Sequence, residues 1–260
     1  MPARFARASA PGEARKIEDK VYAARSILVV GAHAFDAEVI AGPLAAAAVQ
    51  GGAEVTFLHL SMGEQGHPSL APEYYCVQKQ EEAAKAAARL GVAMRSLGLH
   101  DAFLPCDDET ALKVCDVVRE LKPQIVITHW HGSWHKDHRA AARLTQTGIF
   151  FAALPTLKRD HAAHTPQLLL FGENWEDDEG FRPEHLVDVS DGFEAWSEAV
   201  REYELARGLS SFPYVDYYSA LYRLRGCLRG TRYAQGFAAA SQSWQAGSGL
   251  FAPANRSGSR

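Results

Sequence analysis

Two short stretches of this chain carry side chains that can hold a metal ion or move a proton. The first follows the apolar run at residues 27–30 and contains His33, Asp36 and Glu38. The second follows the apolar run at residues 124–128 and is rich in histidine: His129, His131, His135 and His138, with Asp137 before the last of them. Two histidines and a carboxylate that leave one position open suit catalytic zinc. Zinc lowers the pKa of a water bound to it to about 7 and polarises a carbonyl, so the two stretches together predict hydrolysis of an amide or ester.

The spacing within each stretch suits one shared ion. His33 and Asp36 lie three residues apart on a turn, near enough to hold one ion if the loop bends back, and His135 and His138 have the same spacing. One of the two later histidines would be left without the metal, free to protonate a leaving group or stabilise an oxyanion. Trp134, beside them, could stack on a sugar ring or pack against the fold.

The elements that must position these stretches follow from the hydrophobic pattern. The run at residues 27–30, ended by Gly31, is apolar at every position and predicts a strand buried on both faces. Further strands are predicted at residues 54–60, 94–99, 124–128, 167–171 and 185–189. Helices are predicted at residues 39–50, 73–90, 139–153, from Asp107 or Asp108 to about 121, and after Ser190.

This alternation of strands and helices predicts an α/β fold. We expect a Rossmann-like, mostly parallel sheet with helices on both faces and the strand order 3-2-1-4-5. In that order the connections reverse direction between the first and fourth strands, and ligands of such sheets bind in the crevice at this switch point. Both polar stretches follow these two strands, so they should open into the same crevice.

Length and composition set further bounds. The 260 residues predict one α/β domain over residues 25–246, preceded by an arm at 1–24 and followed by a disordered tail at 247–260. A net charge of −4 gives no reason to expect nucleic acid or an anionic membrane as a partner. The N-terminus lacks the apolar core of a signal peptide, and no run approaches the ~20 apolar residues of a membrane span, so we expect a cytoplasmic protein.

Other chemistries lack their motifs. The first loop, GAHAFDAE, has no glycine-rich fingerprint for a dinucleotide, and no GKS or GKT sequence follows a strand. A GxSxG elbow for a serine hydrolase is also missing from the sequence. Cys106 precedes two aspartates, an acidic setting that does not favour a cysteine nucleophile.

Three motifs together resemble one family. AHxxDAE at residues 32–38, GExG at 63–66 and HxDHRAA at 135–141 resemble the PIG-L/LmbE-like zinc de-N-acetylases, which remove acetyl groups from N-acetylglucosamine-containing conjugates on a Rossmann-like fold. The likeness covers about residues 26–155 and continues more weakly at 187–190 and 233–237. It implies one zinc ion per chain, held by His33, Asp36 and His138, and it implies that His135 lies beside these ligands and assists the tetrahedral intermediate. It also implies a small N-acetylated sugar conjugate as substrate; a homo-oligomer is compatible with the sequence.

The chain departs from the family pattern at the acid–base position. Phe35 stands where the family carries the carboxylate general base, and phenylalanine cannot accept a proton. Lys136 replaces the usual proline of the histidine motif. Four residues could take over proton transfer, of which we favour the first two: Glu64, His135, Glu38 and Asp137. Lys79, where relatives often carry an arginine, is predicted to contact substrate together with Trp134 and Phe35. The alternative hypothesis is a catalytically silent member that binds metal and ligand.

Overall fold

A central sheet organises the molecule, which we describe from a computed structural model over residues 11–241. Within these residues the sheet has seven strands in the order β3-β2-β1-β4-β5-β7-β6. The strands are β1 (Ser26–Gly31), β2 (Glu54–Ser61), β3 (Ala93–Leu99), β4 (Ile125–Thr128), β5 (Leu168–Gly172), β6 (His185–Asp188) and β7 (Ala234–Ala239). The first five run parallel in the predicted order, and β7 pairs antiparallel with both β5 and β6.

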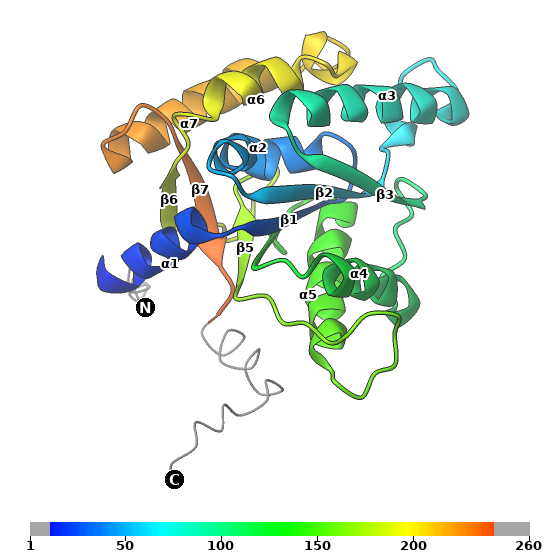
Figure 1. The fold of residues 1–260 in the computed structure, drawn as a ribbon. Coiled ribbons are helices and arrows are strands. Elements are labelled where there is room, and N and C mark those ends of the chain that lie inside the picture. Colours follow the sequence, from blue (N-terminus) through cyan, green and yellow to red (C-terminus); the bar gives the residue numbers. More distant parts are fainter. Residues whose placement is uncertain (1–10, 242–260) are drawn as a thin grey trace, which may run out of the picture.

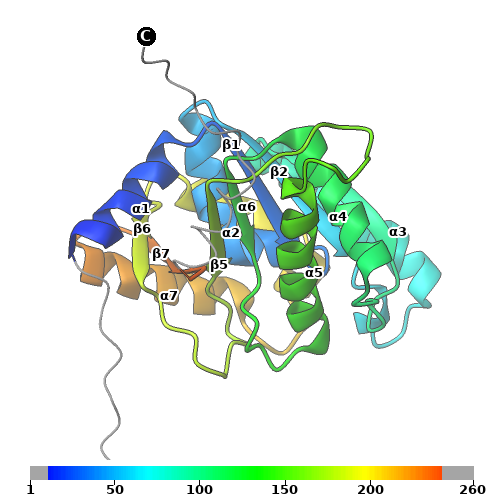
Figure 2. The same ribbon diagram turned by 90° about the horizontal axis from the view of Figure 1, so that it is seen from below.

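Helices cover both faces of this sheet. They are α1 (Pro11–Ala23), α2 (Asp36–Gln50), α3 (Pro72–Leu90), α4 (Asp108–Leu121), α5 (Lys136–Ala153), α6 (Phe193–Val200) and α7 (Tyr214–Arg229). Two short 3₁₀ helices span Glu64–Gly66 and Glu204–Arg207. Helices α2, α3, α6 and α7 lie over one face (Figure 1), and α4 and α5 lie over the other, where Figure 2 shows them in front. The predicted Rossmann-like architecture is therefore confirmed and is extended by β7.

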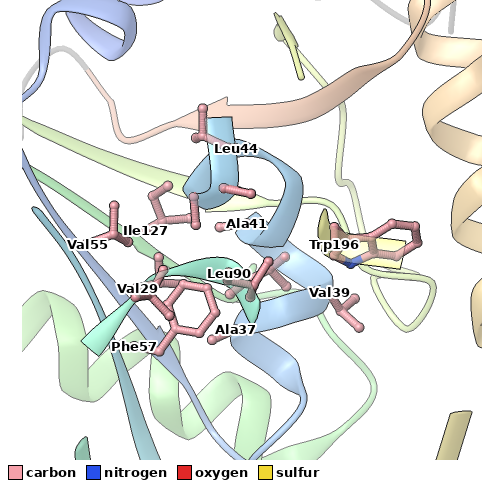
Figure 3. Close-up of a cluster of buried hydrophobic side chains, with 14 of the residues drawn as sticks. Val29, Ala37, Val39, Ala41, Leu44, Val55, Phe57, Leu90, Ile127 and Trp196 are labelled. Atoms are coloured by element: carbon pink, nitrogen blue, oxygen red, sulfur yellow. The ribbon is translucent and has the colours of Figure 1, made fainter. Parts of the chain in front are cut away.

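Strand β1 is buried on both sides, as its composition predicts. Ile27 and Val29 belong to the apolar cluster beneath α2, whereas Leu28 and Val30 belong to the cluster beneath α4 and α5. Figure 3 shows the first cluster, in which side chains of β1, β2 and β4 meet one side of α2 while Trp196 of α6 lies on its other side. Because β1 is fixed on both faces, the loop that follows it starts from a rigid position.

The close contact between α2 and α6 depends on a glycine. A Cβ atom at Gly42 would lie 2.5 Å from Cδ1 of Trp196, closer than van der Waals contact allows. The indole Nε1 donates a hydrogen bond of 3.0 Å to the carbonyl oxygen of Glu38 in the first turns of α2. Helix α6 therefore holds the start of α2, which carries part of the candidate site.

The N-terminal arm includes a helix that the sequence pattern did not predict. Helix α1 lies beside β6 (Figure 1), the Tyr22 hydroxyl accepts a hydrogen bond of 2.9 Å from the backbone N–H of Asp188, and Val21 is buried. The predicted domain limits remain predictions, and the tail at 247–260 lies outside the described residues. No helix of residues 11–241 is long and apolar enough to cross a membrane.

A buried arginine fixes the end of α5. Arg119 of α4 is 2% exposed and donates to five backbone carbonyl groups at or beyond the C-terminus of α5: Phe151, Ala152, Leu154, Leu157 and His161. These bonds use all five guanidinium N–H groups and satisfy carbonyls that a helix end leaves without partners.

We expect Arg119→Met to lower the free energy of unfolding by about 3–5 kcal/mol, because the buried carbonyls would lose their donors. Urea unfolding measures this change. Arg143→Met, at an exposed position on α5, is the matched control and should change stability by at most about 0.5 kcal/mol. Equal stability of the two variants would contradict this role for Arg119.

Candidate metal centre

The two chemistry-bearing stretches meet at the carboxyl ends of β1 and β4. These strands are neighbours, with Val30 paired to Thr128, so the loops that follow them start side by side. Helix α2 begins at Asp36 and helix α5 at Lys136, each three residues earlier than predicted. Asp36 and His138 therefore lie in the first turns of two helices, while His33 lies on the turn between β1 and α2.

Asp36 is the centre of the cluster. Its Oδ2 atom lies 3.1 Å from Nδ1 of His33 and 3.4 Å from Nε2 of His138. These three side chains each offer a ligand atom, and the atoms lie within 4.8 Å of one another. The backbone N–H of His33 also donates to Oδ2 at 2.8 Å, which holds the carboxylate in place.

The second nitrogen of each of these imidazoles faces a carboxylate. Nε2 of His33 lies 3.0 Å from Oδ1 of Asp101 and 3.5 Å from Oδ2 of Asp137. Nδ1 of His138 lies 3.1 Å from Oε2 of Glu176. Histidines that bind metals almost always present their other nitrogen to a carboxylate, carbonyl or water, which fixes the ring and raises its basicity. This arrangement fits a metal centre at His33, Asp36 and His138.

The charges of the cluster also suit a cation. Although burial opposes ionisation of Asp36, the pKa of this carboxyl is held well below its ordinary value by His138, His33 and His129. Burial lowers the pKa of His138 to about 3, so its imidazole is neutral and free to bind a metal. Burial disfavours a proton on His33, but Asp36, Asp101 and Asp137 outweigh it and raise the pKa well above the ordinary value. In the metal-free protein, a proton on His33 thus supplies the positive charge that a bound metal ion would otherwise supply.

His135 lies beside these donors rather than among them. Its ring centroid is 5.0 Å from that of His33 and 4.5 Å from that of His138. As the N-cap of α5 it accepts a hydrogen bond of 3.3 Å on Nδ1 from the backbone N–H of Asp137. With Nδ1 used as an acceptor, the neutral ring carries its proton on Nε2. Burial, followed by the charge of His33, lowers the pKa of His135, so this neutral donor form prevails.

A pocket of about 210 Å³ opens onto the cluster. His33, Asp36, His135 and His138 form part of its wall, and Asp101 and Glu176 contribute carboxylates. The remaining wall is largely aromatic: Phe35, Tyr75, Trp175, Tyr214 and Tyr218. The pocket therefore combines aromatic side chains with the His33, Asp36 and His138 cluster.

Phe35 forms the apolar side of this pocket next to the cluster. Its ring is 3% exposed and meets the rings of Tyr203 and Tyr214 edge-on, at centroid distances of 5.1 and 5.0 Å. Its backbone has φ 96° and ψ −30°, a region that phenylalanine rarely occupies. The residue is the N-cap of α2 but makes no side-chain hydrogen bond to the helix. The fold thus imposes a conformation that a small polar residue would adopt more readily.

The other predicted substrate contacts differ in position. Lys79 of α3 is buried on the pocket wall, its Nζ donates a hydrogen bond of 2.8 Å to the carbonyl of Ala34, and it lies 4.9 Å from the ring centroid of Tyr203. Trp134 is 53% exposed and is not among the lining residues, although its ring centroid lies 5.5 Å from that of His135. Contact of either residue with a substrate stays a prediction.

The structure separates the residues considered for proton transfer. Oε1 of Glu64 accepts a hydrogen bond of 2.9 Å from the backbone N–H of Asp101, so Glu64 supports that loop and does not line the pocket. Glu38 is buried and accepts a hydrogen bond of 2.6 Å from the Tyr203 hydroxyl. Asp137 is fully buried between Lys136 and His33, where it orients the imidazole. His135 alone of the four reaches the pocket wall.

Asp101 and Glu176 were not predicted from the sequence. Asp101 follows β3 at the same edge of the sheet as the two recognised stretches, so the rule that selected those loops could have selected this one. Glu176 lies in the acidic segment after β5, whose irregular pattern gave no element to place it. Burial and then Asp36 raise the pKa of Glu176 to about 7.

The fold and the site define a class: a Rossmann-like α/β protein with a centre of two histidines and one carboxylate at its switch point. Residues 28–148 match the family model described as GlcNAc-PI de-N-acetylase, PIG-L. This match confirms the resemblance to the PIG-L/LmbE-like family that the three sequence motifs predicted.

Three relatives illustrate the range of the likeness. Diacetylchitobiose deacetylase of Thermococcus kodakarensis is 26% identical over 240 residues, which cover 85% of either chain. 1D-myo-inositol 2-acetamido-2-deoxy-α-D-glucopyranoside deacetylase 1 of Catenulispora acidiphila is 31% identical over 172 residues, 54% of this chain and 53% of that protein. The structure of 4-carboxy-2-hydroxymuconate hydratase from Pseudomonas putida superposes on this protein with a TM-score of 0.77. The superposition covers 84% of this chain and 96% of that one, and the sequences are 22% identical. This likeness shows the shared fold.

Proposed function

We propose that this protein is a zinc-dependent amide hydrolase that removes the acetyl group from an N-acetylglucosamine-containing small molecule. The observation that carries the proposal is the convergence of His33, Asp36 and His138 within 4.8 Å at the switch point, with His135 beside them on the pocket wall. The deacetylases of T. kodakarensis and C. acidiphila support the reaction and the class of substrate.

Each part of the site has a task in this reaction. When bound, zinc would polarise the amide carbonyl as a Lewis acid. His135 lines the pocket, and its Nε2–H group can stabilise the oxyanion that forms from the carbonyl and later protonate the leaving amine. Asp101, Asp137 and Glu176 keep the ligand imidazoles in their orientation. Phe35 and Tyr214 offer an apolar surface for the acetyl methyl group or for one face of the sugar.

Proton removal from the attacking water needs a separate acceptor, because Nδ1 of His135 is occupied by its capping bond. Besides Asp36, the carboxylates that line the pocket among residues 11–241 are Asp101 and Glu176. In the metal-free protein burial and then Asp36 raise the pKa of Glu176 to about 7, and its side chain lines the pocket. We assign the acceptor role to Glu176 in a protein that turns over.

The second hypothesis is a silent member of the family that holds metal and ligand without turnover. Its single supporting observation is the buried Phe35 ring at the position of the family's base. Acetate release by the zinc-loaded protein from a panel of N-acetylglucosamine conjugates separates the two hypotheses. Acetate release from any conjugate would reject the silent alternative, and binding of a conjugate without release would reject hydrolysis of it.

The role of His135 has its own test. We expect His135→Ala to keep the bound metal and to lower kcat by ~100-fold or more, as for the loss of an acid–base group. Metal content by elemental analysis and acetate release measure the two effects. His131→Ala, which changes an exposed histidine of the same loop, is the matched control and should leave both the bound metal and kcat unchanged. Loss of metal in His135→Ala would mean that His135, not His138, is the ligand.

A further inference from the structure

Asn174 is a buried amide on the wall of the pocket that the proposed reaction leaves without a task. It lies two residues beyond β5, at the same edge of the sheet as the metal ligands, and is 7% exposed. A side-chain amide has two N–H donors and one oxygen acceptor, and burying either kind of group without a partner costs free energy. The hydrogen bonds of Asn174 therefore indicate what the pocket is built to bind.

The oxygen of this amide is fully occupied by the protein. Oδ1 accepts a hydrogen bond of 3.2 Å from the backbone N–H of Glu176 and one of 3.1 Å from the Tyr218 hydroxyl. The same hydroxyl accepts a hydrogen bond of 3.1 Å from the backbone N–H of Trp175, so its own proton is directed at Asn174. Because a backbone N–H can only donate, the atom that faces it is the amide oxygen, and the orientation of the amide is fixed.

The nitrogen of the amide has no partner in the protein. No atom of residues 11–241 accepts a hydrogen bond from Nδ2, and this nitrogen is not one of the fully buried polar atoms that lack a partner. Nδ2 is therefore reached by solvent, and Asn174 meets solvent where it lines the pocket. Its N–H groups are thus available as hydrogen-bond donors to a molecule in the pocket.

The backbone around Asn174 holds this donor in place. The N–H of Asn174 donates to Oδ2 of Asp177 at 3.0 Å, and the N–H of Asp177 donates to the carbonyl of Asn174 at 3.0 Å. The carbonyl of Glu176 accepts hydrogen bonds from the N–H of Trp134 at 3.0 Å and from the hydroxyl of Ser133 at 3.2 Å. A donor that is fixed before binding loses little conformational entropy when its acceptor arrives.

The acceptor for this donor is identified by the groups that the proposed reaction leaves free. In that reaction the acyl carbonyl oxygen already has two partners, the metal ion and the Nε2–H group of His135. Asp101 and Glu176 also line the pocket, and when ionised they can accept hydrogen bonds from sugar hydroxyl groups but cannot donate to them. A hydroxyl group both donates and accepts, so its oxygen needs a donor such as the amide of Asn174.

We propose that Asn174 determines specificity by donating a hydrogen bond from Nδ2 to one hydroxyl oxygen of the sugar ring that carries the acetamido group. This inference rests on the proposed function and adds to it a residue that recognises the sugar rather than the acyl group. A sugar that lacks this hydroxyl would leave the donor unpaired in a largely buried position, and sites built in this way discriminate between close analogues.

The test uses the zinc-loaded full chain with methyl N-acetylglucosaminide and its analogues that lack the hydroxyl at C3, C4 or C6. The ratio of kcat/KM for the parent sugar to that for each analogue gives the preference of the protein for that hydroxyl. We expect the preference for one of these hydroxyls to fall about 10-fold in Asn174→Ala, the size of one neutral hydrogen bond. The preferences for the others should stay within ~2-fold, as for groups that do not interact with the mutated side chain.

Asn174→Asp separates the Nδ2 donor from the structural hydrogen bonds of this side chain. Ionised aspartate keeps an oxygen for the bonds from Glu176 and Tyr218 but has no donor, so this variant should lose the same preference as the alanine variant. Gln167→Glu makes the same change of amide to carboxylate at an exposed position just before β5, and as the matched control it should retain every preference. Preferences that survive in both Asn174 variants, or that fall equally for every hydroxyl, would overturn the inference.

Titration calorimetry with the same sugars separates this inference from the proposed function, because a dissociation constant can be measured without turnover. If the parent chain releases no acetate, the ratios of the dissociation constants give the hydroxyl preferences instead. Loss of one preference in both Asn174 variants would then support the inference and reject the reaction for this sugar. Acetate release with unchanged preferences would overturn the inference and leave the reaction standing, and a chain that binds none of the sugars would overturn the inference as well.

Discussion

Replacing His33 or His138 with alanine is expected to remove most of the zinc from a protein that otherwise carries about one ion per chain. Both imidazoles contribute a nitrogen to the cluster around Oδ2 of Asp36. Loss of either leaves two protein donors, so the affinity should fall by more than the 10–100-fold typical of losing an outer partner. Asp101→Asn removes such an outer partner of His33, so the zinc affinity of this variant should fall by only about 10–100-fold.

Elemental analysis after dialysis and titration calorimetry measure these losses, with His131→Ala as the control and circular dichroism as the check on the fold. Zinc binding should release a proton, because the pKa of His33 in the metal-free protein is raised above its ordinary value. The apparent affinity should therefore weaken as the pH falls below that pKa. Unchanged metal content in both alanine variants would place the ion elsewhere in the chain.

Phe35→Asp is expected to raise acetate release from an N-acetylglucosamine conjugate by about 10²–10⁴-fold if the native protein lacks a general base. The new carboxylate would stand on the pocket wall beside the ligand Asp36. Aspartate tolerates the positive φ of this position better than phenylalanine and can cap the first turn of α2, which now has no side-chain cap.

Phe35→Asn is the matched control, because asparagine has the same shape but cannot accept the proton. Both variants lose the edge contacts of the buried Phe35 ring with Tyr203 and Tyr214, and both gain a side chain that can cap α2. Because the loss of the ring outweighs the gain of the cap, the free energy of unfolding should fall by about 2–4 kcal/mol in each. An activity gain in the aspartate variant alone would identify the base. Equal gains in the two variants would show that removal of the ring, rather than proton transfer, is responsible.

A native protein that is already active would point to a substitute base. Phe35→Asp should then change little or do harm, and Glu176→Gln should lower kcat by about 10²–10⁴-fold. If the native protein and Phe35→Asp both hold metal, fold and release no acetate, hydrolysis of that conjugate is rejected. The silent, ligand-binding hypothesis would then take precedence for it.

The core of this architecture and the candidate ligand set could be predicted from the sequence alone. The run at residues 27–30 is apolar at every position, which is typical of a strand covered on both faces, and the alternation with helices predicted the common Rossmann order for the first five strands. Since β1 and β4 flank the switch point, the loops that carry His33, Asp36, His135 and His138 had to meet. Local pattern and the handedness of the connections were enough for that inference.

The outer parts of the fold left weaker signals in the sequence. Strand β7 is composed largely of alanine and glycine, with no alternation of large apolar and polar residues, and its partners lie far away in sequence. Helix α1 has a polar sequence whose place is decided by contacts such as Tyr22 with Asp188 and Glu18 with Arg229. Such contacts between distant segments appear only once the chain is folded.

At the site, too, contacts between segments distant in the sequence set the direction of the side chains, and local pattern could not predict it. The sequence offered Glu64 as a base, but the fold turns its carboxylate to the backbone of Asp101 and brings Asp101 and Glu176 to the imidazoles instead. The rings of Trp134, Trp175, Phe212 and Tyr217 contact one another in sequence order, although no local pattern connects these residues. Residue types and spacing determine which atoms are available near a strand end, whereas the direction of each side chain depends on packing and hydrogen bonds supplied by segments far away in the sequence.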